Sequence, residues 1–254
     1  MGRLSGRTAI VTGGAKGIGV HYADALAAEG AQVMIGDIID GSGVAKDINA
    51  HHGQGAVDSA IVDVSNEAAV KKFVVRTLER FGKIDILINN AAVFAHLPSQ
   101  GVEDIDVADW DKVMGVNIRG PFLMAKHVVP HMKKAGYGKI INIGSGTAHK
   151  GLADFSHYVA SKGAMTAFSR ALSRELGGHK ICVNTLAPGF TISDSVLDNI
   201  EHHERWRQVI VAGRAMKREM LPEDLRGAIV FLSSAESDFV TGQTISVCGG
   251  SVNT

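Results

Sequence analysis

A tyrosine and a lysine four residues apart are the side chains of this chain best suited to acid–base chemistry. Tyr158 and Lys162 have the i, i+4 spacing that places two side chains on one face of a helix. A free tyrosine has a pKa of about 10, too high for an efficient base at neutral pH. A cation at about 4 Å, at an effective dielectric constant of about 20, stabilises a phenolate by about 4 kcal/mol. That energy corresponds to about three pKa units. The pair therefore predicts a tyrosine poised near neutrality, although the same spacing also fits a contact between two solvated side chains.

Two polar residues that precede this pair extend the candidate site. Ser145 follows an apolar, strand-like run at 139–143 and comes thirteen residues before Tyr158. A hydroxyl at the carboxyl end of a strand can hold a substrate oxygen while the next helix brings up the phenol. Asn117 lies in the middle of a long helical pattern, where asparagine is a mediocre helix former. We therefore expect either a structural reason for Asn117 or a role in proton relay.

A glycine-rich loop follows the first apolar run and opens a helical pattern. Residues 12–19 read Thr-Gly-Gly-Ala-Lys-Gly-Ile-Gly. Glycines let the backbone turn tightly and approach a pyrophosphate, and the free N–H groups of a helix N-terminus favour its negative charge. The spacing differs from the commoner Gly-x-Gly-x-x-Gly, and a strand-to-helix turn can need glycine for steric reasons alone. The loop predicts a dinucleotide site only together with its context.

Acidic residues near the ends of the second and third strand-like runs supply part of that context. Asp37 comes eighteen residues after Gly19, about where an acid accepts hydrogen bonds from the adenosine ribose. A carboxylate there repels the 2′-phosphate of NADP, whereas Lys16 in the loop offers that phosphate a partner. We therefore predict NAD, with NADP as the less favoured alternative. Asp63, followed by Val64, either accepts from the adenine amino group or caps the helix expected to begin near 67.

Apolar runs and amphipathic segments alternate along the chain. The strand-like runs lie at 8–12, 32–37, 60–64, 84–89, 139–143, 181–186 and 244–247, and the helical patterns near 18–29, 67–81, 109–134, 158–177 and 222–234. Uniformly apolar strands indicate a sheet covered on both faces. The alternation predicts an α/β fold with a doubly wound parallel sheet and right-handed crossovers. We expect one domain over 1–254, with the polar segment near 191–215 covering the carboxyl edge of the sheet, where such folds bind ligands.

Composition excludes several functional classes. Lys plus Arg equals Asp plus Glu at 26 each, so the formal net charge is zero, unlike the basic footprint of nucleic-acid-binding proteins. No apolar run approaches the roughly 20 residues of a membrane-spanning helix. We expect Cys182 and Cys248 to be buried free thiols, in keeping with a reducing cytoplasm. The adjacent histidine pairs 51–52 and 202–203 point in different directions on a helix or strand, so no metal site is expected.

These motifs together resemble the short-chain dehydrogenase/reductase family along the whole chain. The glycine motif matches residues 12–19, the Asn-Asn-Ala motif matches 89–91, and a Pro-Gly segment matches 188–189. The catalytic tetrad matches Asn117, Ser145, Tyr158 and Lys162. The resemblance implies that Tyr158 is the acid/base and that Lys162 lowers its pKa and holds the nicotinamide ribose. It implies that Ser145 orients the substrate oxygen and that Asn117 anchors a water in a proton relay.

The same resemblance, together with the positions of Lys16, Asp37, Asp63 and Val64 argued above, indicates which residues surround the ligands. Those expected to contact the dinucleotide are Gly13, Lys16, Gly17, Ile18, Gly19, Asp37, Asp63, Val64, Asn90, Ala91, Tyr158, Lys162, Pro188, Gly189, Thr191 and Ser193. Those expected to form the substrate wall, on family position alone, are Phe94, His96, His149, Leu152, Phe190 and Trp206. The mixed character of this wall favours an apolar or aromatic substrate. The family also implies a Rossmann-type sheet of seven strands in the order 3-2-1-4-5-6-7, and a homotetramer packed through two long central helices.

Three positions depart from the family pattern without touching the tetrad. Ala92 stands where glycine usually ends the fourth-strand motif, Cys248 where aspartate is usual near the C-terminus, and Cys182 where a basic residue is common. We predict an NAD-dependent oxidoreductase that acts on a secondary alcohol or ketone in the cytoplasm. The alternatives are an NADPH-dependent carbonyl or 3-oxoacyl thioester reductase and a non-catalytic dinucleotide-binding protein on the same fold.

Overall fold

Seven parallel strands form the central sheet of this computed structural model, which describes residues 2–95, 97–198 and 207–252. The strands lie in the order β3-β2-β1-β4-β5-β6-β7, and every pairing is parallel. Their bounds are β1 Thr8–Thr12, β2 Gln32–Asp37, β3 Val57–Ile61, β4 Ile86–Asn89, β5 Gly138–Ile143, β6 Ile181–Pro188 and β7 Thr244–Val247. The predicted strand order and fold class are therefore confirmed.

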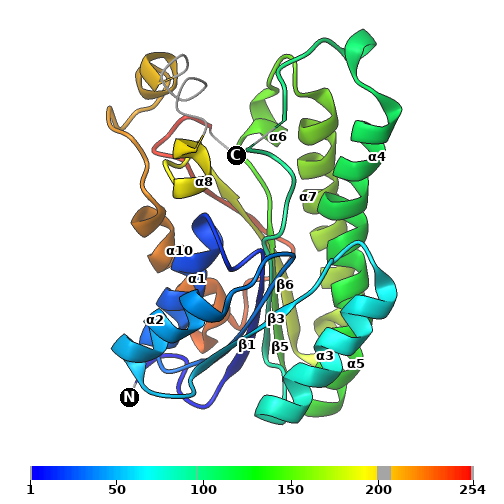
Figure 1. The fold of residues 1–254 in the computed structure, drawn as a ribbon, viewed down its shortest axis with the longest axis vertical. Helices are drawn as coiled ribbons and strands as arrows, with labels where there is room; N and C mark the ends of the chain where they lie inside the picture. Colours follow the sequence, from blue (N-terminus) through cyan, green and yellow to red (C-terminus); the bar gives the residue numbers. More distant parts are fainter. Residues whose placement is uncertain (1, 96, 199–206, 253–254) are drawn as a thin grey trace.

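Helices cover both faces of the sheet. Figure 1 shows α1, α2 and α10 on one face and α3, α5 and α7 on the other. The helices are α1 Ile18–Ala28, α2 Ser42–His52, α3 Glu67–Phe81, α4 Val107–Met114, α5 Gly120–Ala135, α6 Thr147–Lys150, α7 Ser156–Leu176, α8 Asp194–Leu197 and α10 Arg226–Ser233. None of the helices in the described ranges is both long and apolar enough to cross a membrane.

Alternate residues of the central strands build two separate cores. In β1, Ala9 and Val11 belong to the core under α1, α2 and α10, whereas Ile10 belongs to the core under α3, α5 and α7. Successive side chains of a strand point to opposite faces, so a strand that is apolar throughout must be covered on both sides. All five residues of β1 are buried, which is the physical reason for the apolar run Ala9–Val11 between its two threonines.

Several elements differ from the sequence-based expectation, among them the short helices α6 and α8, which were not predicted. The third strand runs three residues earlier than the predicted 60–64, because Val57 begins a register in which Ile61 pairs with Asp37. Helix α2 was not predicted, since its sequence is largely polar and contacts the core mainly through Ala45 and Ile48. The predicted helix 109–134 is interrupted at 115–119 by a turn of π-helix. That turn contains Asn117, one of the four residues that match the catalytic tetrad.

Candidate active site

The four tetrad residues come from three neighbouring elements. Ser145 follows the end of β5 at Ile143, Tyr158 and Lys162 lie one turn apart on α7, and Asn117 lies in the π-helical turn between α4 and α5. Strands β4, β5 and β6 all end at the same edge of the sheet because they are parallel. The topology therefore gathers the tetrad at the carboxyl edge, where doubly wound folds bind their ligands.

Tyr158 is buried and has an aromatic neighbour. The ring of Phe94 lies on that of Tyr158 with a centroid separation of 4.6 Å and an interplanar angle of 32°. Burial raises the pKa of Tyr158 to about 12, and a hydrogen bond with Ser145 acts in the opposite direction. The expected pKa near neutrality is not found in this structure, because the hydrogen bond does not offset the cost of burying a phenolate.

Lys162 is also buried, and its ammonium is held by the backbone. Its Nζ donates a hydrogen bond to the carbonyl oxygen of Ile143 at 2.8 Å. It lies 5.7 Å from the centroid of the Tyr158 ring. Burial lowers the pKa of Lys162 to about 8, since the charged form is penalised in a low-dielectric site. A lysine with such a pKa can exchange protons near neutral pH.

Asn117 has a structural reason for its place inside a helix. Its Oδ1 accepts a hydrogen bond from the N–H of Val93 at 2.8 Å, and its Nδ2 donates to Ser161 Oγ at 3.0 Å. Ser161 Oγ in turn donates to the carbonyl oxygen of Tyr158 at 2.7 Å. The asparagine thus joins the loop after β4 to the turn of α7 that carries the tyrosine. A π-turn inside a helix often marks a functional site, and Ser161 is a partner that the sequence analysis missed.

The glycine loop has the shape that a dinucleotide needs. Gly13 and Gly17 have φ angles of +62° and +66°, which favour glycine. A Cβ on Gly19 would lie 2.0 Å from the carbonyl oxygen of Gly13, so the loop backbone closes tightly at that point. Asn90 Nδ2 holds the turn by donating to the carbonyl oxygens of Thr12 and Gly13 at 2.9 and 2.8 Å. The N-cap position of α1 is Gly17, which has no side chain to cap the helix. The backbone N–H groups at this helix N-terminus can therefore bind an anionic group.

Asp37 faces this loop from the end of β2. Its Oδ2 accepts a hydrogen bond from the N–H of Ala15 at 3.0 Å, and its Oδ1 accepts one from the N–H of Ile39 at 3.3 Å. The two bonds fix a half-buried carboxylate beside the loop, where an adenosine ribose would lie.

Asp63 lies farther along this edge, after β3. It accepts hydrogen bonds from the N–H and the hydroxyl of Ser65 at 2.8 and 2.7 Å. Asn66 rather than Asp63 caps α3, through its contact with the N–H of Ala69. The capping alternative is therefore wrong, and Val64 beside Asp63 is buried. The proposed adenine contact remains a prediction.

Helix α8 lies against the glycine loop. Asp194 Oδ1 accepts a hydrogen bond from the N–H of Gly17 at 2.9 Å. Asp198, directly after α8, forms an ion pair with Lys16. Sequence analysis placed Lys16, Thr191 and Ser193 near the dinucleotide but missed both aspartates. The partners lie more than 170 residues apart in the sequence, and no local pattern signals such contacts.

The predicted substrate wall is only partly assembled. Phe94 contacts Tyr158, and its ring lies 6.5 Å from that of Phe155. Leu152 and Phe190 are half-buried, whereas His149 is exposed on α6. His96 and Trp206 lie outside the described residues. Phe94 is therefore the wall residue for which the geometry gives the firmest place.

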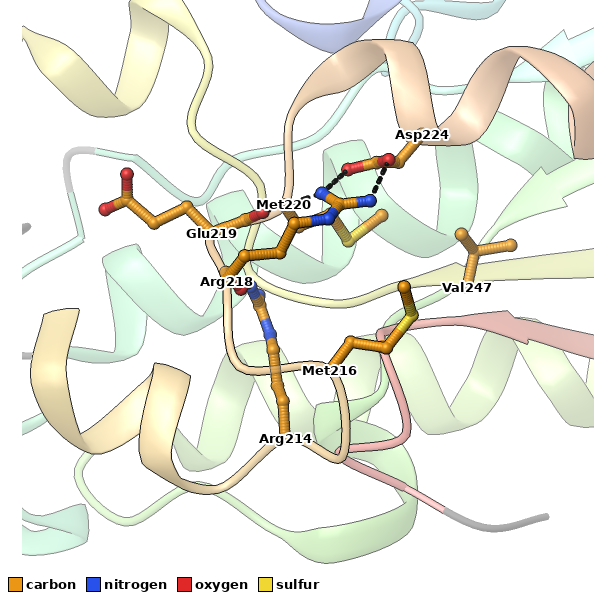
Figure 2. Close-up of a pocket in the computed structure, with 8 residues that line it drawn as sticks. Arg214, Met216, Arg218, Glu219, Met220, Asp224 and Val247 are labelled. Atoms are coloured by element: carbon orange, nitrogen blue, oxygen red, sulfur yellow. Dashed lines mark hydrogen bonds and ion pairs between the residues drawn. The ribbon is translucent and has the colours of Figure 1, made fainter.

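A pocket of about 190 Å³ lies beside the end of β7 and contains none of the tetrad (Figure 2). Its lining residues are Arg214, Met216, Arg218, Glu219, Met220, Asp224, Val247 and Gly249. Arg218 pairs with Asp224 through two hydrogen bonds of 2.7 and 2.6 Å. Arg214 is buried and donates to the carbonyl oxygens of Phe190 and Arg218. These arginines hold parts of the segment after β6 together.

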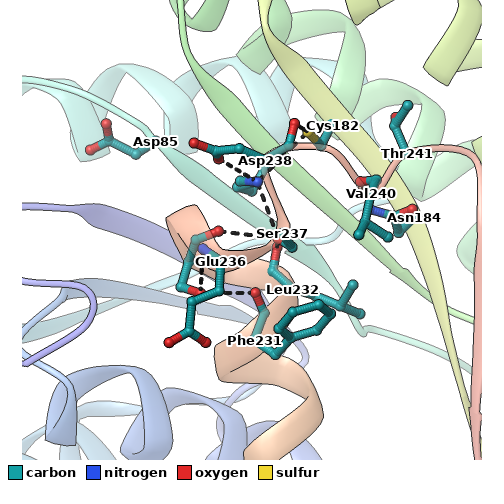
Figure 3. Close-up of polar contacts among 12 residues, drawn as sticks. Asp85, Cys182, Asn184, Phe231, Leu232, Glu236, Ser237, Asp238, Val240 and Thr241 are labelled. Carbon is teal, nitrogen blue, oxygen red and sulfur yellow. Dashed lines mark hydrogen bonds and ion pairs between the residues drawn. The ribbon is translucent and has the colours of Figure 1, made fainter.

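An ion pair between a buried lysine and an exposed aspartate lies at the other end of β5. Lys139, at the start of that strand, is 1% exposed, and its Nζ contacts Asp238 Oδ1 at 2.7 Å and Ser237 Oγ at 3.1 Å. Figure 3 shows Cys182, Ser237 and Asp238 gathered around this point. Because Ser145 follows the opposite end of β5, the pair is remote from the tetrad.

Cys182 and Cys248 are buried free thiols, as expected.

Metal ligands are not clustered in the described part of the chain. Within residues 2–95, 97–198 and 207–252, no group of three or more His, Cys, Asp or Glu side chains could hold a metal ion.

Comparisons with known proteins agree with this geometry. Residues 13–252 match a family model described as enoyl-(acyl carrier protein) reductase. The chain is 36% identical over 248 residues to (2S)-[(R)-hydroxy(phenyl)methyl]succinyl-CoA dehydrogenase subunit BbsD of Thauera aromatica, with 97% of each chain covered. It is 35% identical over 260 residues to galactitol 2-dehydrogenase of Agrobacterium fabrum, with 98% of each chain covered.

One solved structure with the same fold contains a bound dinucleotide. The crystal structure of 3-ketoacyl-(acyl-carrier-protein) reductase from Brucella melitensis, complexed with NADH, superposes with a TM-score of 0.87 at 32% identity. The match covers 98% of this chain and 99% of the other.

Proposed function

The chain belongs to the short-chain dehydrogenase/reductase family, whose members bind a nicotinamide dinucleotide, and we propose that it uses NAD to oxidise apolar or aromatic secondary alcohols or to reduce the corresponding ketones. It is an oxidoreductase that acts on alcohols and carbonyl groups. The choice of NAD, the class of substrate and the roles of the individual residues are the proposal.

The carboxylate of Asp37 is the observation that carries the choice of NAD. Two backbone N–H groups hold it at the end of β2, facing the glycine loop. A fixed negative charge accepts hydrogen bonds from ribose hydroxyls and repels a 2′-phosphate. Lys16 is the cation that would favour NADP, and its partner is Asp198. The NADH complex of the Brucella relative supports the same choice.

Each tetrad residue has its own role in the proposed mechanism, and that role follows from its position. When bound, the dinucleotide supplies nicotinamide C4 as acceptor or donor of the hydride. In oxidation, the Tyr158 phenolate takes the hydroxyl proton as the hydride leaves the carbinol carbon, and Ser145 holds the oxygen. In reduction, the neutral phenol returns that proton to the oxygen. Lys162 stabilises the phenolate, and Asn117 holds α7 in register through Ser161.

The positive charges near Tyr158 must offset its burial. Burial raises the pKa of Tyr158 to about 12, which favours the neutral acid needed for reduction. The Lys162 ammonium and the positive nicotinamide of the oxidised dinucleotide both favour the phenolate needed for oxidation. We propose that the tyrosine becomes an effective base only with both charges in place.

Aromatic side chains beside the tyrosine support an apolar substrate. Phe94 lies on the Tyr158 ring and is close to Phe155. Stacked and tilted aromatic contacts of this kind favour an aryl group over a polyol. The name of the Thauera relative describes a substrate with a phenyl-substituted carbinol.

One relative favours a second candidate function. The Brucella enzyme is a 3-ketoacyl-(acyl-carrier-protein) reductase, which makes a 3-oxoacyl thioester reductase the second candidate. A strong preference for NADPH would favour it. A non-catalytic dinucleotide-binding role is less well supported, because all four tetrad residues are present.

We also propose a homotetramer in the cytoplasm. Trp110 on α4 and Phe122 on α5 are exposed by 38% and 47%, and these two helices lie on the same side of the sheet as α7. A contact between copies would cover them. The two free thiols fit a reducing compartment.

Separate titrations with NADH and NADPH test the proposal. We expect NADPH to bind at least about tenfold more weakly, equivalent to about 1.4 kcal/mol, and Asp37→Ser to remove most of that difference. Asp40→Ser is the matched control, since Asp40 is an exposed acid nearby that contacts Ser42. Preferential binding of NADPH by the parent would contradict the proposal and favour a carbonyl reductase.

A further inference from the structure

The N–H of Gly17 has an anionic partner from a distant part of the chain. Asp194 Oδ1 accepts its hydrogen bond at 2.9 Å. The side chain of the next residue is also close, because a Cβ on Gly17 would lie 3.0 Å from Ser195 Oγ. In Figure 1, α8 lies directly above the start of α1. The carboxylate of Asp194 therefore lies at the N-terminus of α1.

A phosphate of the dinucleotide requires the same place. Helix α1 has no acidic residue in its first turn and no side-chain cap from its own N-cap residue. Its unsatisfied N–H groups and dipole favour an anion. In doubly wound folds that anion is the pyrophosphate of the cofactor. A carboxylate on the N–H of Gly17 and a phosphate oxygen on the same N–H exclude one another, both by volume and by charge repulsion.

The neighbouring acid has a related effect on the loop. Asp198 forms an ion pair with Lys16, the cation of the loop. Its hydrogen bond raises the pKa of Lys16. Asp194 in α8 and Asp198 directly after it therefore both bind the glycine loop, the first through the N–H of Gly17 and the second through the side chain of Lys16.

Helix α8 is short enough to be displaced from the glycine loop. It has four residues, and its hydrogen bonds are those of a single turn, such as Leu197 N–H to the carbonyl oxygen of Ser193 at 2.9 Å. One isolated turn has little stability of its own. The preceding residues are anchored, because Ile192 donates to the carbonyl oxygen of Met220 at 2.8 Å. The contacts of Asp194 and Asp198 contribute to holding α8 against the glycine loop.

We propose that Asp194 sets the affinity for the dinucleotide by competing with its pyrophosphate for the N–H of Gly17, and that Asp198 reinforces this by holding Lys16. Binding of the dinucleotide displaces the Asp194 carboxylate from the loop. The inference rests on dinucleotide binding but not on the choice between NAD and NADP. It assigns Asp194 a role in affinity that is distinct from that of Asp37, which reads the ribose.

Binding measurements on Asp194 variants test the proposal. We expect Asp194→Ala to bind NADH about five- to tenfold more tightly than the parent, because the competing acceptor is gone. Asp194→Asn keeps an oxygen that can accept the hydrogen bond but loses the charge, so we expect a smaller gain. Adenosine has no phosphate, and its affinity should be the same in the parent and both variants. Glu79→Gln, an exposed acid on α3, is the control for loss of one negative charge.

The outcomes separate this inference from the proposed function. Unchanged or weaker NADH binding by Asp194→Ala, with adenosine affinity intact to show a folded site, would overturn the competition. Equal gains in Glu79→Gln and Asp194→Ala would overturn it too, since the effect would then be one of net charge. A parent that binds neither NADH nor NADPH would overturn the proposed function and, with it, this inference.

Discussion

The Nζ of Lys162 donates to the carbonyl oxygen of Ile143 over 2.8 Å, which fastens the last residue of β5 to α7. This bond sets the distance between the strand end that leads to Ser145 and the helix turn that carries Tyr158. It also places an ammonium in a buried site, where its charge is costly. The buried ammonium of Lys162 therefore lowers the stability of the fold and, in the proposed mechanism, stabilises the Tyr158 phenolate.

Replacing Lys162 by methionine should make the protein more stable and inactive. The pKa of Lys162 is lowered from 10.5 to about 8 by burial. The native state therefore binds fewer protons than the unfolded state between those values, so its stability rises with pH across that window. Below about pH 8 the native state carries the full penalty. We expect Lys162→Met to raise the free energy of unfolding by about 1–3 kcal/mol at neutral pH. Urea unfolding should show this gain shrinking as the pH approaches 10.5, and a gain independent of pH would count against the argument.

Ser145→Ala should change the pH dependence of oxidation. The hydrogen bond from Ser145 lowers the pKa of Tyr158, so its removal raises that pKa. Oxidation needs the phenolate, and the rising limb of log kcat/KM against pH should therefore move to higher pH. The loss of a group that holds the substrate oxygen should also lower kcat by about 10²- to 10³-fold.

Thr147→Val is the matched control for the Ser145 experiment. Thr147 Oγ1 donates to Ser145 Oγ at 2.9 Å, so this variant perturbs the serine without removing it. The rising limb should stay in place in Thr147→Val. A limb that does not move in Ser145→Ala would show that the serine does not act on the tyrosine.

Asn117→Ala should destabilise the fold as well as slow the reaction. It removes the acceptor of the Val93 N–H and the donor to Ser161 Oγ. A buried N–H without a partner costs about 1–3 kcal/mol, which chemical denaturation can measure. Ser161→Ala loses the contact with Asn117 but keeps the Val93 bond, so it should cost less. If the two variants are equally stable, the Val93 bond is not what the asparagine contributes.

Gly19→Ala should abolish dinucleotide binding. The added Cβ would lie 2.0 Å from the carbonyl oxygen of Gly13 and 2.7 Å from Asn90 Nδ2, so the loop must open. Gly43→Ala on α2 is the control, because nothing lies within 4 Å of its added Cβ. NADH titration should show no binding for Gly19→Ala and parent-like affinity for Gly43→Ala. Parent-like affinity in both would mean that the loop does not form the phosphate site.

Much of the sheet was predictable from the sequence because its central strands are buried on both faces. The bounds of β1, β2 and β7 agree with the apolar runs at 8–12, 32–37 and 244–247. The third strand was misplaced because Val62 and Val64 are buried after it has ended, so that burial and strand pairing do not coincide there. Helix α2 has too few buried positions to produce a clear period.

The candidate site was predictable where its residues lie in local motifs. Glycine spacing and the Tyr158–Lys162 turn depend on neighbours in the sequence, and the structure places them at one sheet edge. The bonds of Asn117 to Val93 and of Asp194 to Gly17 join distant segments, and no periodicity encodes such pairs. The pKa of Tyr158 was misjudged because burial is a property of the folded chain rather than of the spacing.

The most direct test of the account compares the parent with Tyr158→Phe on a panel of aryl and alkyl secondary alcohols with NAD⁺, following NADH formation. The phenyl ring preserves the contact with Phe94 and removes only the hydroxyl that exchanges the proton. NADH should still bind, and kcat should fall at least about 10²-fold, as expected for loss of a general base. Turnover close to that of the parent would contradict the assignment of Tyr158 as the acid/base, and with it the proposed mechanism.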